Sequence, residues 1–168
     1  FIPSIFFVAY ESSSIFHNRV NDAVKEVITY EKTTNSSVGK RITFAINSWE
    51  IIKNNPLIGV GTGDLPTEYQ KVNLINQSRT INATNTHNMY TLVLIQNGLL
   101  GLIGLLSIFY YQIKLSLNSP NKFIRDLGIT LPLLYLLVMW SDSYLLGHFT
   151  TLVFVFFSSF LYKDFEKN

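Results

Sequence analysis

The sequence predicts an all-α fold, namely a fragment of a polytopic helical membrane protein with a large extracytoplasmic helical loop. The first observation is composition: 48% of the 168 residues are hydrophobic and only 14% are charged, whereas about 25% are charged in soluble domains. The second is a division near residue 87, where a mostly polar stretch gives way to almost continuous apolar sequence. The third is that apolar residues of the polar stretch recur at helical spacing.

The first segment, residues 1–10, is apolar but too short to span a bilayer, which takes roughly 20 residues. We interpret it as the end of a truncated transmembrane helix whose parent chain extends upstream. A signal peptide is a weaker alternative, because a basic segment before the apolar run and a small-residue cleavage site are both missing.

Two amphipathic helices are predicted in the extracytoplasmic loop, residues 11–87. The first follows serines that can cap a helix, and its apolar residues return every three or four positions. These residues are Phe16, Val20, Ala23, Val24, Val27 and Tyr30. Because charges fill the opposite face, we expect this helix to lie on the membrane surface or on the rest of the protein.

The second amphipathic helix is predicted from about residue 38 to residue 54. Its apolar face consists of Ile42, Ala45, Ile46, Trp49 and Ile52. Pro56 prevents its continuation, since proline cannot extend the hydrogen-bond ladder. No sustained period follows between residues 56 and 86. Closely spaced glycines predict a tight, irregular loop there, at Gly59, Gly61 and Gly63.

Three transmembrane helices are predicted within residues 88–162, followed by a cytoplasmic tail at residues 163–168. The expected spans are residues 88–113, 127–140 and 148–162. The first is long enough to cross with tilt, at about 1.5 Å per residue, and the shorter two are expected inside a helical bundle. Glycines at every third residue of the first span would permit close helix packing. They are Gly98, Gly101 and Gly104.

The short loops predict the orientation of these spans. Basic residues lie between the first and second spans and after the third, and such loops are cytoplasmic by the positive-inside rule. These residues are Lys114, Lys122, Arg125, Lys163 and Lys167. The loop at residues 11–87 and the turn at residues 141–147 are therefore expected outside the cytoplasm.

Basic side chains in the outer loop could bind an anion. Lys40 and Arg41 stand near the start of the second amphipathic helix, where the positive end of the helix dipole favours anions. Arginine forms bidentate bonds with phosphate oxygens, and Arg79 lies on the same side of the membrane. The alternative, which spacing alone favours, is that these are solvated surface cations.

His87 and Asp142 are candidates at the outer ends of the spans. An imidazole at the position of His87, where the polar loop meets the first span, could take a proton from a sugar hydroxyl. Asp142 ends the second span, and charged residues at such positions are often functional. The alternatives are an interfacial histidine, amphipathic like the adjacent Tyr90, and a simply hydrated aspartate.

Several other kinds of chemistry are disfavoured. There is no Cys, and hence no disulfide framework or thiolate metal site. Histidines at metal-binding spacing, an Asp-x-Asp pair and a nucleophile elbow are all absent from the sequence, so neither a metal nor a cofactor is expected. The net charge of +2 is too small to indicate a nucleic-acid partner. The loop at residues 59–63 could cradle phosphate, but a plain turn is favoured because the flanking strand and helix of a nucleotide fingerprint are missing.

Two blocks of this sequence resemble the signature of the O-antigen ligase and O-antigen polymerase family. In residues 41–63 an arginine-led helix with a tryptophan runs into a Pro-Leu-x-Gly-x-Gly turn, and in residues 87–101 a His-Asn block precedes Gly-x-x-Gly. The matching residues are Arg41, Trp49, Pro56, Gly59, Gly61, His87, Asn88, Gly98 and Gly101. The resemblance covers roughly residues 37–160. Gln96 departs from it, since family members often have glutamate there.

The resemblance implies a metal-independent, inverting glycosyltransferase. Its donor would be a glycan on a polyprenyl-diphosphate carrier, and its acceptor a glycolipid or a growing glycan in cell-envelope polysaccharide assembly. The protein would be multi-pass in the bacterial inner membrane, with an extracytoplasmic active face. The resemblance does not separate ligation, polymerisation and transfer to a protein hydroxyl.

Carried onto this sequence, the resemblance assigns roles to particular residues. Arg41 is expected to bind the donor diphosphate, and His87 to act as general base or to orient the acceptor hydroxyl. The further residues expected to bind substrate are Lys40, Arg79, Asn88, Gln96 and Asp142. Asn88 and Gln96 are also expected to support His87. The family's upstream helices are missing, so this fragment is expected to hold an incomplete active site.

Two further hypotheses come from different functional classes. A transporter or flippase for lipid-linked glycan would carry broken helices and charges at mid-membrane depth, whereas the candidate charges here cluster in the outer loop and at helix ends. A non-catalytic subunit would only bind envelope lipid. Function that survives His87→Ala and Arg41→Ala would favour either of these over an enzyme.

Overall fold

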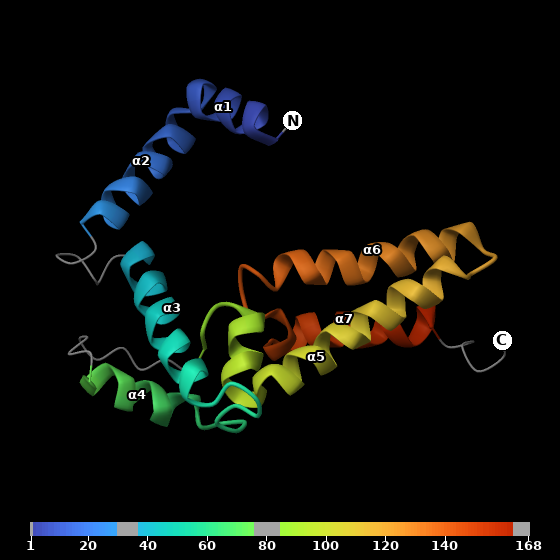
Figure 1. The fold of residues 1–168 in the computed structure, drawn as a ribbon. Coiled ribbons are helices and arrows are strands. Elements are labelled where there is room, and N and C mark those ends of the chain that lie inside the picture. Colours follow the sequence, from blue (N-terminus) through green and yellow to red (C-terminus); the bar gives the residue numbers. More distant parts are fainter. Residues whose placement is uncertain (1, 30–36, 76–84, 163–168) are drawn as a thin grey trace. The chain divides into compact units, whose positions relative to one another are not determined.

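The structure is a computed structural model that describes residues 2–29, 37–75 and 85–162. Every regular element in these ranges is a helix (Figure 1), which confirms the all-α prediction. The chain divides into two compact units, residues 1–46 and 47–168. The division falls inside helix α3 (Ser37–Asn54).

The first unit contains helices α1 (Ile2–Ser12) and α2 (Ser14–Ile28). Among the predicted capping serines, Ser13 is the cap of α2, because its side chain accepts a hydrogen bond from the Phe16 N–H. The rings of Tyr10 and His17 stack at 4.2 Å between centroids, and the Tyr10 hydroxyl donates to Asn21. No residue of α2 is buried. Val24 and Val27 of its predicted apolar face are exposed, Phe16 packs against Phe6, and Tyr30 lies outside the described residues.

Helix α3 agrees with the predicted range, but its buried face does not match the predicted apolar face. Asn47 and Ser48 are buried, whereas Trp49 is 59% exposed. The cause is helix α4 (Leu65–Ile75), whose Asn73 side-chain oxygen accepts a hydrogen bond from the Asn47 amide at 2.7 Å. This bond gives each amide a partner inside the protein, so both side chains can be buried. Their polarity had placed them on the solvent-facing side of the helical pattern.

Helix α4 was not predicted, because it lies in the segment where no sustained period was found. Its buried residues do return at helical spacing, at Leu65, Tyr69, Val72 and Asn73. The pattern is short, and one of its four positions is polar, so the helix depends on the contact with α3 more than on its own sequence.

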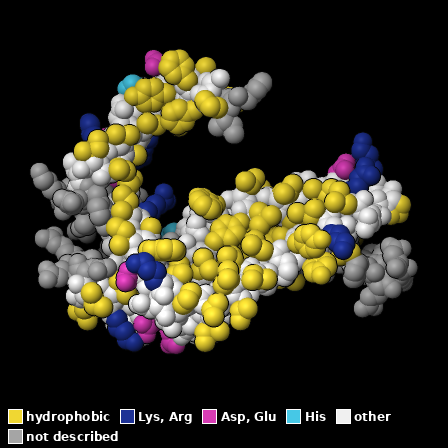
Figure 2. All heavy atoms as spheres, viewed as in Figure 1, with side chains coloured by type: hydrophobic (Ala, Val, Ile, Leu, Met, Phe, Trp, Pro, Cys, Tyr) yellow, Lys and Arg dark blue, Asp and Glu magenta, His cyan; other side chains and the backbone are white. Residues whose placement is uncertain are grey.

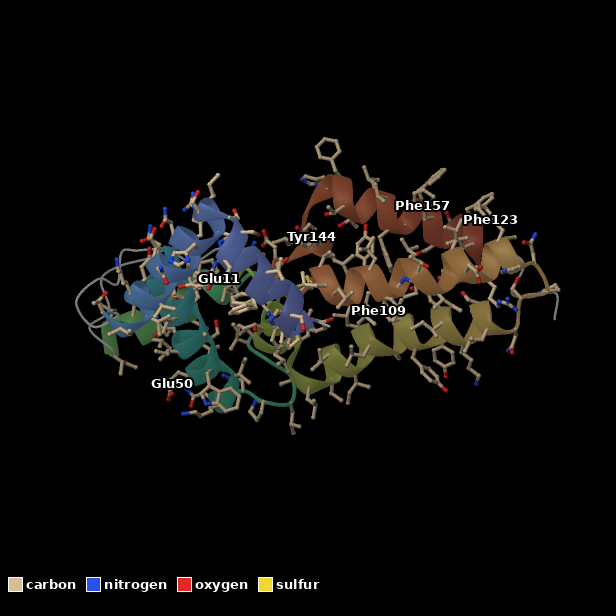
Figure 3. All side chains as sticks on the ribbon, turned by 90° about the horizontal axis from the view of Figure 1, so that it is seen from above. Glu11, Glu50, Phe109, Phe123, Tyr144 and Phe157 are labelled. Atoms are coloured by element: carbon tan, nitrogen blue, oxygen red, sulfur yellow. The ribbon has the colours of Figure 1, made fainter. Side chains whose placement is uncertain are left out.

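The second unit contains a bundle of α5 (Met89–Leu117), α6 (Lys122–Val138) and α7 (His148–Leu161), with a 3-10 helix, η1 (Tyr144–Leu146), before α7. Helix α6 packs along α5, and α7 packs along α6 (Figure 1). Phe109, Tyr135 and Met139 form its buried core, with Phe154 packed against them. Figure 3 shows Phe109 between the helices and Phe157 projecting away from them.

Helix α6 begins at Lys122 rather than at residue 127, because the Asn121 side chain accepts hydrogen bonds from the N–H groups of Phe123 and Ile124. Among the described helices, α5 is the one long and apolar enough to cross a membrane, and α7 is a shorter apolar helix. Large hydrophobic side chains cover the outer surface of the bundle (Figure 2), including Leu100, Leu137, Phe149, Leu152 and Phe156.

Helix α5 is interrupted at Gly98, whose backbone has φ 63° and ψ −160°. The loop that follows α3 docks on this interruption through backbone hydrogen bonds. They run from Val60 N to Ile95 O, from Gly61 N to Gln96 O, from Leu99 N to Pro56 O and from Leu100 N to Leu57 O. The predicted irregular loop is thus held in the second unit by backbone hydrogen bonds.

Two glycines permit this close approach of two backbones. A Cβ on Gly59 would lie 2.5 Å from the backbone of Gln96, and a Cβ on Gly98 would lie 2.3 Å from the backbone of Leu57. Within the glycine repeat of α5, Gly98 therefore serves loop docking rather than the expected helix packing, and a Cβ on Gly101 would meet the Asn97 side chain of the same helix. At Gly104 an added Cβ would meet nothing within 4 Å.

Candidate active site

The start of α5 is joined to the end of α6 by hydrogen bonds. Asn88 caps α5, because its Oδ1 accepts from the Thr91 N–H at 3.0 Å, and its Nδ2 donates to the Trp140 carbonyl at 3.0 Å. The Met89 N–H donates to the Met139 carbonyl at 3.0 Å. These bonds hold the segment before α5 against the segment after α6.

Two of the predicted site residues, His87 and Asp142, meet at this junction. The His87 Nδ1 lies 3.3 Å from the Asp142 Oδ1. The two side chains are 50% and 48% exposed, so a substrate can reach them. Because α5 and α6 run antiparallel, residues 55 positions apart in sequence come to the same end of the helix pair.

One carboxylate oxygen, Oδ1 of Asp142, faces three nitrogen donors. They are the Ser143 N–H at 2.7 Å, the His87 Nδ1 at 3.3 Å and the Asn85 Nδ2 at 3.4 Å. An ionised carboxylate only accepts hydrogen bonds, so the contact fits the imidazole tautomer that carries its proton on Nδ1. In the neutral imidazole the lone pair is then on Nε2, which can accept a proton. A base oriented by a carboxylate is the arrangement that activates hydroxyl nucleophiles.

The backbone of His87 lies in the left-handed region, with φ 52°. This conformation is uncommon outside glycine, and residues held in it concentrate at functional sites. The Asn85 Oδ1 accepts hydrogen bonds from the His87 N–H at 3.1 Å and from the Ser143 hydroxyl at 2.7 Å. Asn85 and Ser143 were not predicted as site residues, and no spacing or motif in the sequence singles them out.

The basic candidates lie in a different part of the chain. Lys40 and Arg41 are exposed residues of α3 within the first unit. Arg79 lies outside the described residues. Gln96 lies in α5, where its backbone carbonyl accepts the hydrogen bond from Gly61 at 2.9 Å. The structure thus brings His87, Asn88 and Asp142 together, and it places Gln96 at the docked loop.

The glycine loop uses its N–H groups within the fold. Those of Gly59, Val60 and Gly61 donate to the carbonyls of Asn55, Ile95 and Gln96, so these groups cannot also cradle a phosphate. Among the residues that the structure describes, no three His, Cys, Asp or Glu side chains are grouped so that they could hold a metal ion.

A family model described as O-antigen ligase matches residues 1–106. The matched range includes Arg41, His87 and the docked loop, and it ends within α5, before Asp142. No curated protein matches the chain.

Proposed function

Because the chain belongs to the O-antigen ligase family, we propose that it transfers a glycan from a polyprenyl-diphosphate carrier to an acceptor hydroxyl. The family's activity is of the O-antigen ligase or polymerase type, in polysaccharide assembly. One observation supports a specific mechanism for this transfer. His87 Nδ1 and Asp142 Oδ1 lie 3.3 Å apart at the start of the apolar helix α5.

In the proposed reaction, the acceptor hydroxyl attacks the anomeric carbon of the donor sugar. A carbon–oxygen bond forms on one face of that carbon while the bond to the diphosphate oxygen breaks on the other, so the configuration inverts. His87 Nε2 receives the hydroxyl proton, and the imidazolium that results is stabilised by the Asp142 carboxylate. The polyprenyl diphosphate leaves with the bonding electron pair.

The leaving diphosphate needs positive charge close to it, because a fixed cation in a low-dielectric site stabilises developing negative charge. We assign this role to Arg41, with Lys40 and Arg79 as further contacts to the donor. The exposure of Lys40 and Arg41 near the start of α3 supports the assignment, because an anion can reach both side chains and the helix dipole favours it there.

The proposed location is the bacterial inner membrane, crossed several times, with the active face outside the cytoplasm. The apolar outer surface of α5, α6 and α7 supports a membrane setting. His87 and Asp142 share one end of the α5–α6 pair, and the basic residues Lys114, Lys122 and Arg125 flank the turn at its other end.

The test uses the complete protein, purified into liposomes with its polyprenyl-diphosphate glycan and no other acceptor. Products are separated by size for the wild type, His87→Ala and Arg41→Ala. A product ladder that grows only in the wild type supports a polymerase with both residues in its site. Without a ladder, lipid A-core is added, and transfer to it that both variants lose supports a ligase.

The same assay separates the proposal from its alternatives. Losing the base should cost about 10²- to 10⁴-fold in rate, with the variant still present in the membrane. Wild-type transfer by His87→Ala or Arg41→Ala would overturn the role assigned to that residue. Glycan that moves across the bilayer without any new glycosidic bond would identify a transporter instead.

A further inference from the structure

Asn85 connects the two segments that meet at the candidate active site. Its side-chain oxygen accepts hydrogen bonds from the His87 N–H at 3.1 Å and from the Ser143 hydroxyl at 2.7 Å. Its amide nitrogen lies 3.4 Å from the Asp142 Oδ1, as the donor. One side chain thus contacts the backbone of His87, the carboxylate beside the imidazole and the turn after α6.

His87 needs such a contact because its backbone is left-handed, with φ 52°. That conformation is energetically unfavourable for an L-residue. An asparagine side chain that accepts a hydrogen bond from the N–H two residues later forms a local turn and compensates this cost. The bonds from Asn85 to Asp142 and Ser143 then fix this turn relative to the end of α6, 57 and 58 residues further along the chain.

We infer that Asn85 is a positioning residue, which holds His87 so that its Nδ1 meets Asp142 and its Nε2 points toward the reacting hydroxyl. The inference rests on the proposed role of His87 as general base. Asn85 itself exchanges no proton with the substrate. It acts through the orientation of the imidazole, and a displacement of about 1 Å in such a group can lower a rate 100-fold.

The first test compares Asn85→Ala with the wild type of the complete protein in liposomes that contain polyprenyl-diphosphate glycan. The expected result is a kcat lower by about 10- to 100-fold, with an unchanged KM for the donor, because the donor diphosphate contacts other residues. A purely structural role would instead reduce the amount of folded protein and leave kcat per folded molecule unchanged.

Asn121→Ala is the matched control for lost stability. Asn121 is also an asparagine whose side chain accepts backbone hydrogen bonds, but it caps α6 at the end of the bundle that holds the α5–α6 turn. Thermal unfolding should show a similar loss in the two variants, and kcat should fall only in Asn85→Ala. An equal fall of kcat in Asn121→Ala would overturn the inference.

Ser143→Ala tests the same bridge with a smaller change, and it keeps the inference testable if Asn85→Ala does not fold. Among the described residues, the Ser143 hydroxyl is linked to His87 through the Asn85 oxygen. We therefore expect a smaller loss of kcat in Ser143→Ala, and a double variant no slower than Asn85→Ala alone. Losses that multiply in the double variant would show independent roles and contradict the inference.

The His87→Ala measurement distinguishes the two levels of the proposal. If His87→Ala abolishes transfer while Asn85→Ala and Ser143→Ala keep the wild-type kcat, the proposed function stands and the role of Asn85 is wrong. If His87→Ala keeps full activity, the proposed function fails and the positioning role fails with it.

Discussion

At the scale of single residues, the candidate site contains a histidine and an aspartate that the fold brings together. The Nδ1–Oδ1 distance of 3.3 Å is slightly longer than the usual range for such hydrogen bonds, which is about 2.7–3.2 Å. Hydrogen bonds of catalytic groups are often long without substrate and shorten in its complex. The side chains of His87 and Asp142 are half exposed, so they have room to move closer when the bound glycan donor and the acceptor substrate exclude water.

The variant Asp142→Asn tests the orienting carboxylate. We expect kcat to fall by roughly 10- to 100-fold, because a carboxamide can donate as well as accept, so Nδ1 is no longer required to carry the proton. The measurement is the rate of transfer in liposomes at saturating donor.

Asp126→Asn is the control for the loss of one negative charge. Asp126 lies in α6 beside Arg125, with the Arg125 Nε 3.7 Å from its Oδ1, and it is part of the basic end of the bundle. This variant should keep the wild-type rate. If Asp142→Asn is as fast as Asp126→Asn, the orienting role of Asp142 is wrong.

At the scale of elements, the interruption of α5 accounts for glycines from both resembling blocks. Gly59 belongs to the loop that follows α3, and Gly98 belongs to α5. Each lies against the backbone of the other segment. The loop therefore fixes the end of α3 on the helix whose first turn follows His87, which gives the Pro-Leu-x-Gly-x-Gly block a structural role.

The variant Gly98→Ala should break this docking. A Cβ there would lie 2.3 Å from the Leu57 backbone, and φ is +63°, so both sterics and backbone strain oppose the substitution. We expect a loss of more than about 2 kcal/mol in stability, seen as a lower midpoint of thermal unfolding in detergent.

Gly104→Ala is the matched control in the same helix. Nothing lies within 4 Å of its added Cβ, and alanine favours the helix by roughly 0.5–1 kcal/mol over glycine. Its unfolding midpoint should be unchanged or higher. A Gly98→Ala protein as stable as Gly104→Ala would contradict the proposed docking of the loop.

At the scale of the whole molecule, the distribution of apolar and charged side chains favours a membrane protein. The described helices α5, α6 and α7 carry large apolar side chains on their outer surface, and Figure 2 shows charged side chains near the end where α5 turns into α6. In water such a surface would drive aggregation, whereas lipid chains accommodate it at no cost.

Cysteine labelling tests the proposed topology. The chain has no Cys. A single cysteine introduced at Ser141 or at Asn118 is therefore labelled without background from other cysteines of this segment. In intact spheroplasts, an impermeant maleimide should label Ser141→Cys, which is outside the cytoplasm, and should label Asn118→Cys only after the membrane is opened. The reverse labelling pattern would show that the proposed topology is inverted.

A chelator tests the proposed metal independence. The proposed reaction uses Arg41 and His87 for the charge and the proton, so EDTA should leave the rate of transfer unchanged. The assay is the liposome reaction after the membranes have been washed with EDTA. A rate that falls and returns with one divalent metal would overturn this part of the mechanism.

Particular residues show how far prediction from sequence could reach. The range of α3 and the positions of α5 and α7 follow from long apolar patterns and from Pro56, so they were predicted closely. Helix α4 was missed, because its pattern is short and includes the buried Asn73. The prediction of the buried face of α3 was wrong for a related reason. The hydrogen bond between Asn47 and Asn73 allows two polar side chains to be buried.

The sequence alone determined the helical fold class, the apolar half of the chain and the family, because each of these is written in composition, local periodicity or consecutive motif residues. It also singled out His87 and Asp142 individually. Only the tertiary structure decided that these two side chains meet, that Asn85 bridges them and that the loop containing Gly59 docks on a break in α5. The reason is that these contacts join residues far apart in the chain, and the antiparallel packing that brings them together leaves no local signal in the sequence.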